Sequence, residues 1–100
     1  MLRILIADDH AIVRTGLRTL LATEPSMELA GEASGGYEAI ELAEKTQPDV
    51  ILLDLSMPDL DGIEVTKAIK ARFPEVRILI LTIHEDQALL REAIRAGNEF

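Results

Sequence analysis

Hydrophobic and polar residues follow two kinds of pattern that alternate along the chain. Short runs of aliphatic residues are typical of strands buried in a parallel sheet. Longer stretches with apolar residues three and four positions apart are typical of amphipathic helices. The aliphatic runs predict strands at residues 3–7, Met27–Ala33, Val50–Asp54 and Arg77–Thr82. The helical periodicity predicts helices at Val13–Leu21, Tyr37–Thr46, Ile63–Phe73 and Glu85–Ala96. In the first helix, Leu20 is expected to face inward and Arg14 outward.

The order of these elements determines the fold class, because strands and helices alternate strictly and their connections are short. Such alternation predicts an α/β fold, a doubly wound parallel sheet with helices on both faces and right-handed crossovers. The second strand has the weakest pattern, and Glu28 and Glu32 suggest that it lies at an exposed edge. A chain of 100 residues without a linker or an internal repeat fits a single domain, residues 1–100.

Composition and charge narrow the class of protein further. Hydrophobic residues make up 48% of the chain and aromatic residues 3%, which predicts an aliphatic core. A net charge of −8 without a basic stripe argues against a nucleic-acid-binding surface. The lack of cysteine excludes disulfides and thiolate metal sites. No apolar run approaches the roughly 20 residues of a membrane span and no secretory signal is visible, so we expect a cytoplasmic protein without membrane contact.

Acidic residues follow two of the predicted strands. Asp8 and Asp9 come directly after the first strand, and Asp54 ends the third. In a doubly wound sheet of order 2-1-3-4 these strands are neighbours, and their crossovers leave to opposite faces, which creates a ligand-binding crevice. Three carboxylates there repel one another unless a cation joins them, and Mg²⁺ suits oxygen ligands, including a backbone carbonyl near Ser56. Alternatively, Asp8 and Asp9 cap the first helix, which explains one of them better than both.

The chemistry of a carboxylate beside Mg²⁺ points to phosphoryl transfer. Asp54 can attack a phosphorus centre, with the charge of the transferred oxygens stabilised by the metal and a hydroxyl, to give an aspartyl phosphate. Thr82, at the end of the fourth strand, can supply that hydroxyl, although it can also be an ordinary strand residue. No glycine-rich phosphate loop follows the first strand, so nucleotide binding of that kind is unsupported.

Other polar residues of the predicted loops are given structural roles. His10 and His84 are interpreted as solvated loop residues and are assigned to no metal. Asp59 and Asp61 lie in a stretch of turn composition, in which Asp61 is expected to start the third helix.

Together these motifs resemble the receiver domain of two-component response regulators, over essentially the whole chain. The start of the chain is similar to the subfamily whose receivers precede a helix-turn-helix DNA-binding domain. The segments that carry the resemblance are Ala7–His10, Val13-Arg14, Gly16-Leu17, Pro48–Asp54, Met57-Pro58, Asp61-Gly62 and Leu81-Thr82.

The resemblance implies a role for each candidate residue. Asp54 is the expected phosphoacceptor, which takes a phosphoryl group from a histidine kinase, and Asp8, Asp9, Asp54 and the Ser56 carbonyl are the expected Mg²⁺ ligands. Thr82 is the expected switch hydroxyl. The implied fold has the flavodoxin-like strand order 2-1-3-4. The implied module is not an enzyme beyond self-catalysed phosphoryl transfer and hydrolysis.

The resemblance also raises an expectation about the end of the sequence. Family receivers continue into a fifth strand, which ends in a lysine, and a fifth helix, whereas no lysine follows residue 70 here. We therefore expect a truncated receiver with a weakened switch, no direct nucleic-acid binding, and homo-oligomers that form through the exposed edge of the fourth strand. The alternatives are a Mg²⁺-dependent phosphohydrolase with an aspartyl nucleophile, and a structural or assembly fragment.

Overall fold

The computed structural model describes residues 1–81. The predicted helix Glu85–Ala96 and the predicted last strand residue, Thr82, lie outside the described residues. The remaining predicted elements are confirmed, with boundaries within two residues at most ends. The elements in chain order are β1 (Leu2–Ala7), α1 (Ala11–Ala22), β2 (Met27–Ala33), α2 (Gly36–Thr46), β3 (Val50–Asp54), α3 (Gly62–Arg72) and β4 (Arg77–Leu81).

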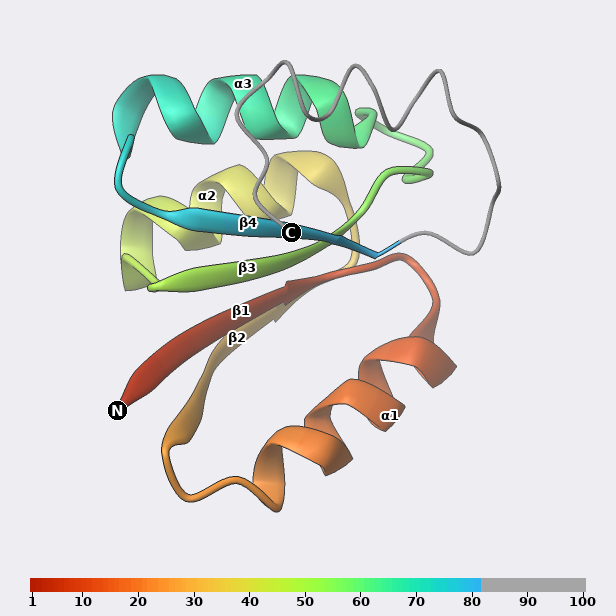
Figure 1. Ribbon diagram of the computed structural model, residues 1–100. Helices are drawn as coiled ribbons and strands as arrows, with labels where there is room; N and C mark the ends of the chain where they lie inside the picture. Colours follow the sequence, from red (N-terminus) through yellow and green to blue (C-terminus); the bar gives the residue numbers. More distant parts are fainter. Residues whose placement is uncertain (82–100) are drawn as a thin grey trace.

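The described strands form one parallel sheet of order β2-β1-β3-β4, which confirms the predicted doubly wound fold class. Helix α1 lies on one face against β1 and β2, and α2 and α3 lie side by side on the other face (Figure 1). Strand β2 is at the edge, as its glutamates predicted. The sheet therefore has a switch point between β1 and β3, where successive helices leave to opposite faces.

The core is aliphatic and centres on the two inner strands. Ile4–Ala7 of β1 and Ile51 and Leu53 of β3 are almost completely buried. Helix α3 packs Val65 and Ile69 against this cluster. Each fully buried aliphatic side chain of this size contributes about 1.5–3 kcal/mol to folding, so the inner strands are the most strongly anchored part of the sheet.

The two inner strands are also joined at the end of the sheet opposite the acidic loops. The backbone N–H of Arg3 donates to Asp49 Oδ2 (2.8 Å), and the Asp49 N–H donates to the Arg3 carbonyl (2.8 Å). The Arg3 side chain also bonds the Thr46 carbonyl at the end of α2. These bonds align β1 with β3 one residue before the first pair of the strand register, Ile4 with Val50.

Helix α1 differs from the amphipathic helix that the spacing predicted. None of its residues is buried, and Leu20, expected to face inward, is 64% exposed. Arg14, expected on the outer face, is instead partly buried, with a side chain only 21% exposed. Val13 and Leu17 of the apolar face are partly buried as well. Arg14 makes a polar contact with the loop after β1, described below. Spacing alone did not reveal this contact.

Candidate functional site

The register of β1 and β3 brings the predicted acids to one end of the sheet. Ala7 pairs with Leu53, so the next residue on each strand is an aspartate, Asp8 or Asp54. Both are buried, with 3% and 6% of their surface exposed. Asp9 follows in the same loop. The structure therefore places the three acids together at the switch point, where the sequence predicted them.

The three carboxylates and His10 form one tight group. Each residue offers one ligand atom, and these atoms all lie within 4.8 Å of one another. His10 Nδ1 lies 2.9 Å from Asp8 Oδ1, 3.0 Å from Asp9 Oδ1 and 3.7 Å from Asp54 Oδ2. The group is a compact polar site that combines hard oxygen donors with one imidazole.

The place of His10 was missed by the interpretation as a solvated loop residue. Its side chain is half exposed, but its backbone N–H donates to Asp8 Oδ1 (2.8 Å), and this turn directs the ring back onto the acids. The hydrogen bond with Asp8, followed by the charge of Asp9, raises the pKa of His10. A signal was present in the sequence, because His10 directly follows two strand-end acids.

The environment of Asp54 favours its neutral form. Burial raises the pKa of its carboxyl, and the charges of Asp8 and Asp9 raise it further. The Ser56 N–H donates to Asp54 Oδ1 (3.1 Å) and opposes this effect, as does the charge of His10. A positive ion at this place would relieve the repulsion, so the electrostatics suit a cation.

The donor set also fits a hard divalent cation. Asp9 Oδ1 is buried and accepts no hydrogen bond, although His10 Nδ1 lies 3.0 Å away. Buried carboxylate oxygens normally have partners, so this oxygen is available as a ligand. Carboxylates with room for water are the donors that Mg²⁺ prefers. The observed carboxylates therefore suit Mg²⁺ better than a structural zinc ion.

The capping alternative for the acids finds no support in the geometry. The N-cap residue of α1 is His10, and its side chain makes no capping hydrogen bond. Asp8 instead accepts the N–H of His10 itself. The acids are therefore turned toward one another and away from the first turn of α1.

The loop after Asp54 is held by the two acids that were expected to be structural. Asp61 is the N-cap of α3 and accepts the Glu64 N–H (3.0 Å). Asp59 accepts the N–H groups of Gly36 (2.8 Å) and Tyr37 (3.2 Å) at the start of α2, and these bonds lower its pKa. The loop that carries Ser56 is thus fixed to two helices.

Strand β4 ends beside the site. Its last described residue, Leu81, pairs with Asp54. Thr82 is the next residue and lies outside the described residues, so its role as a switch hydroxyl stays a prediction.

A doubly wound parallel sheet with buried acids at its switch point defines the class of flavodoxin-like α/β domains, and comparison with known proteins gives the family. Residues 4–99 match the family of response regulator receiver domains. The chain therefore belongs to the response regulator receiver domain family.

Its relatives are transcriptional regulators. The uncharacterized transcriptional regulatory protein YhcZ of Bacillus subtilis (strain 168) is 46% identical over 96 residues, which cover 96% of this chain and 45% of YhcZ. DegU of Brevibacillus brevis is 40% identical over 96% of this chain and 41% of its own length. The chain thus spans less than half the length of these curated relatives.

Solved structures agree with the fold. The receiver domain of the putative response regulator NarL from Mycobacterium tuberculosis superimposes with a TM-score of 0.91 at 34% identity, covering 97% of this chain and 78% of that chain. A LuxR-family response regulator from Aurantimonas sp. SI85-9A1 gives a TM-score of 0.91 at 39% identity, covering 98% and 70%. Within residues 1–81, no helix is long and apolar enough to span a membrane.

Proposed function

We propose that this receiver domain accepts a phosphoryl group on Asp54 in a Mg²⁺-dependent reaction. The observation that carries the proposal is the close group of Asp8, Asp9 and Asp54, in which Asp8 and Asp54 are buried and one buried oxygen of Asp9 lacks a hydrogen-bond partner. Family membership supports a signalling role. Among the three acids, Asp54 is the one that ends a strand, and its N–H partner, Ser56, lies in the following loop.

The proposed step is a displacement at phosphorus. A carboxylate oxygen of Asp54 forms a bond to the phosphorus of a phosphohistidine, and the P–N bond breaks with its electron pair left on the imidazole nitrogen. Asp8, Asp9, Asp54 and the Ser56 carbonyl are the proposed ligands of Mg²⁺, which when bound neutralises charge on the phosphoryl oxygens. Ser56 N–H orients the Asp54 carboxylate, and Thr82 is the proposed switch hydroxyl.

The proposed partner is a histidine kinase, which supplies the phosphoryl group. The relatives are named as transcriptional regulatory proteins, and this chain covers 45% of YhcZ. We assign the phosphorylation switch to the part that they share with this chain and the control of transcription to the rest of their length. The net charge of −8 favours this division, since a DNA-binding surface needs basic residues.

Self-association through the edge of β4 remains a prediction from the sequence. In the part of the sheet that the structure describes, β4 is the last strand. Sedimentation velocity tests it: association that rises with concentration supports edge pairing, and a monomer at high micromolar concentration contradicts it.

Intact-mass spectrometry after incubation with acetyl phosphate and Mg²⁺ tests the function. We expect one added phosphoryl group, which is lost in Asp54→Asn and retained in the matched control Asp49→Asn. Asp49 is a carboxylate at the opposite end of β3. Continuous release of phosphate from many substrates without accumulation on Asp54 would favour the alternative phosphohydrolase. No modification with Mg²⁺ present would contradict the proposal.

A further inference from the structure

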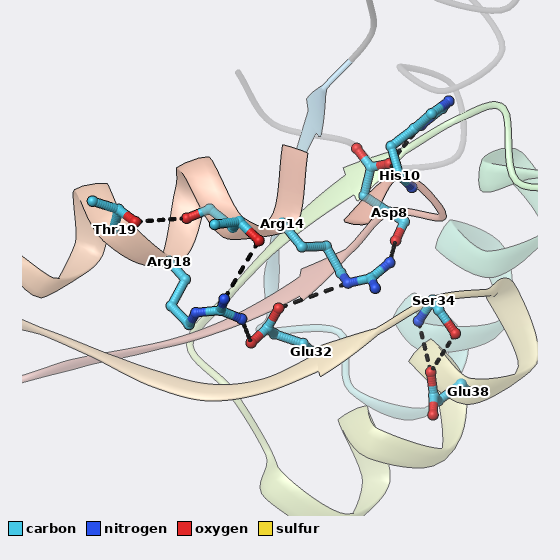
Figure 2. Close-up of polar contacts among 9 residues, drawn as sticks. Asp8, His10, Arg14, Arg18, Thr19, Glu32, Ser34 and Glu38 are labelled. Atoms are coloured by element: carbon cyan, nitrogen blue, oxygen red, sulfur yellow. Dashed lines mark hydrogen bonds and ion pairs between the residues drawn. The ribbon is translucent and has the colours of Figure 1, made fainter. Parts of the chain in front are cut away.

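Arg14 connects helix α1 to the backbone of the acidic loop. Its Nη1 donates to the carbonyl oxygen of Asp8 at 2.6 Å, and Figure 2 shows the guanidinium reaching from α1 to this residue. The Asp8 N–H donates to the Ala33 carbonyl of β2 at 3.0 Å. The peptide groups on both sides of the Asp8 Cα are therefore held, one by the edge strand and one by Arg14.

Glu32 of β2 forms an ion pair with the Arg14 guanidinium on the side away from Asp8. Glu32 Oε1 lies 3.7 Å from Arg14 Nε, and Glu32 Oε2 lies 2.6 Å from Arg18 Nη1 (Figure 2). The side chains of Arg14 and Glu32 are 21% and 23% exposed, whereas that of Arg18 is 49% exposed. A planar guanidinium with partners on two sides is held more firmly than an ammonium group in the same place.

The Asp8 carbonyl needs such a partner because of its position. The strand pairing of β1 ends at Ala7, so this carbonyl lies beyond the sheet ladder. A backbone carbonyl at a buried residue is costly without a hydrogen bond. Arg14 satisfies it, while the Asp8 carboxylate accepts the His10 N–H. These bonds set the direction in which Asp8 and Asp9 leave the strand.

We propose that Arg14 is a positioning residue for the cation site, with Glu32 as its orienting partner. Arg14 acts through the backbone of Asp8 and touches neither the cation nor the phosphoryl group. The inference rests on the proposed function, because it explains how two of the proposed ligands are held in place.

The direction in which the Mg²⁺ dissociation constant changes when Arg14 is replaced distinguishes a positioning role from a purely electrostatic one. Arg14 carries a positive charge near the acidic group, so its removal by charge alone would strengthen binding of a cation. Loss of positioning would weaken binding, because the ligands would no longer be held in one geometry. The two explanations therefore predict opposite changes in the Mg²⁺ dissociation constant.

Calorimetric titration of the whole chain with Mg²⁺ is the test. We expect Arg14→Met to weaken binding about tenfold, at the lower end of the effect of groups that orient metal ligands. Arg14→Lys, which keeps the charge and one donor, should recover part of this loss. Arg72→Met is the matched control, because Arg72 at the end of α3 pairs with Glu44 of α2 and touches neither Asp8 nor Glu32, and it should bind within about twofold of wild type.

Amide hydrogen exchange in the metal-free chain gives a second readout. Exchange of the His10 N–H should accelerate in Arg14→Met and stay unchanged in Arg72→Met, with both variants melting cooperatively. If Arg14→Met fails to fold, Arg14→Lys carries the test, with binding weakened about threefold. Unchanged or tighter binding by a folded Arg14 variant would overturn the inference. Failure of the wild-type chain to bind Mg²⁺ would instead refute the proposed function, and this inference with it.

Discussion

Replacement of Asp54 by asparagine should stabilise the metal-free protein at neutral pH. The ligand oxygens of Asp8, Asp9 and Asp54 lie within 4.8 Å of one another, and the Asp54 side chain is 8% exposed. Two like charges at that separation repel by about 3.5 kcal/mol when the effective dielectric constant is roughly 20. Asparagine removes this repulsion and keeps an oxygen that can accept the Ser56 N–H.

The expected gain in stability of Asp54→Asn is smaller than the repulsion between Asp54 and the carboxylates of Asp8 and Asp9. The charge of His10 and the Ser56 hydrogen bond favour the Asp54 carboxylate and offset much of the penalty. We expect a net gain of about 1–2 kcal/mol in the free energy of unfolding. For a domain of this size that corresponds to a rise of about 4–16 °C in melting temperature.

The stability gained by Asp54→Asn should increase as the pH rises. Burial raises the pKa of Asp54 above its ordinary value of 3.8, so the folded state prefers the neutral acid. Well below 3.8 the carboxyl is protonated in both the folded and the unfolded chain, and wild type carries no penalty. The penalty develops as the pH rises from 3.8 through the raised folded-state pKa and is complete above it. The two melting temperatures should therefore converge in acid and separate at neutral pH.

Thermal melting by circular dichroism, with and without Mg²⁺, is the assay. A cation at 100 times its dissociation constant stabilises wild type by about 2.7 kcal/mol, and Asp54→Asn should gain less because it lacks one ligand. Asp49→Asn has the same change in charge, but it loses charge from a carboxylate that accepts the Arg3 N–H, so its melting temperature should not rise. A metal-free Asp54→Asn protein less stable than wild type at neutral pH would refute the electrostatic account.

Three further substitutions test the packing around the site by thermal melting. In Gly62→Ala the added Cβ would lie 2.7 Å from Leu55 Cα, so we expect a loss of about 1–3 kcal/mol, and an unchanged melting temperature would contradict the close packing. Gly16→Ala in α1 meets no atom within 4 Å and should gain up to about 1 kcal/mol from helix propensity, whereas a loss would mean that this face is covered. Asp61→Ala removes the N-cap of α3 and should cost about 1 kcal/mol, with Asp61→Asn, which keeps the acceptor, close to wild type.

The sheet and its acids could be predicted from sequence because they depend on local pattern. The aliphatic run that ends in Asp54 marked β3 with the bounds found in the structure. Once the strand order was inferred, the carboxyl ends of β1 and β3 had to meet, and the acids with them.

The rest of the site depends on contacts between distant segments. From the sequence, Arg14 and Glu32 were interpreted as solvent-facing charges. Their pairing depends on α1 packing against β2, which the sequence pattern does not show. His10 read as a solvated residue, because its contact requires a turn that bends its N–H onto Asp8. The apolar spacing of α1 also did not indicate that Leu20 is exposed or that Arg14 donates to the Asp8 carbonyl.

The hydrogen bonds between Arg3 and Asp49 align the two inner strands at one end, so the number of residues in each strand sets where its acid lies at the other end. The distance in sequence from Arg3 to Asp8 is five residues, and from Asp49 to Asp54 it is also five. One residue inserted into β1 would move Asp8 about 3.3 Å along the strand and turn it to the opposite face of the sheet. Functional homologues should therefore tolerate changes in length in the connection before β2, while a change within β1 would have to be matched by one within β3.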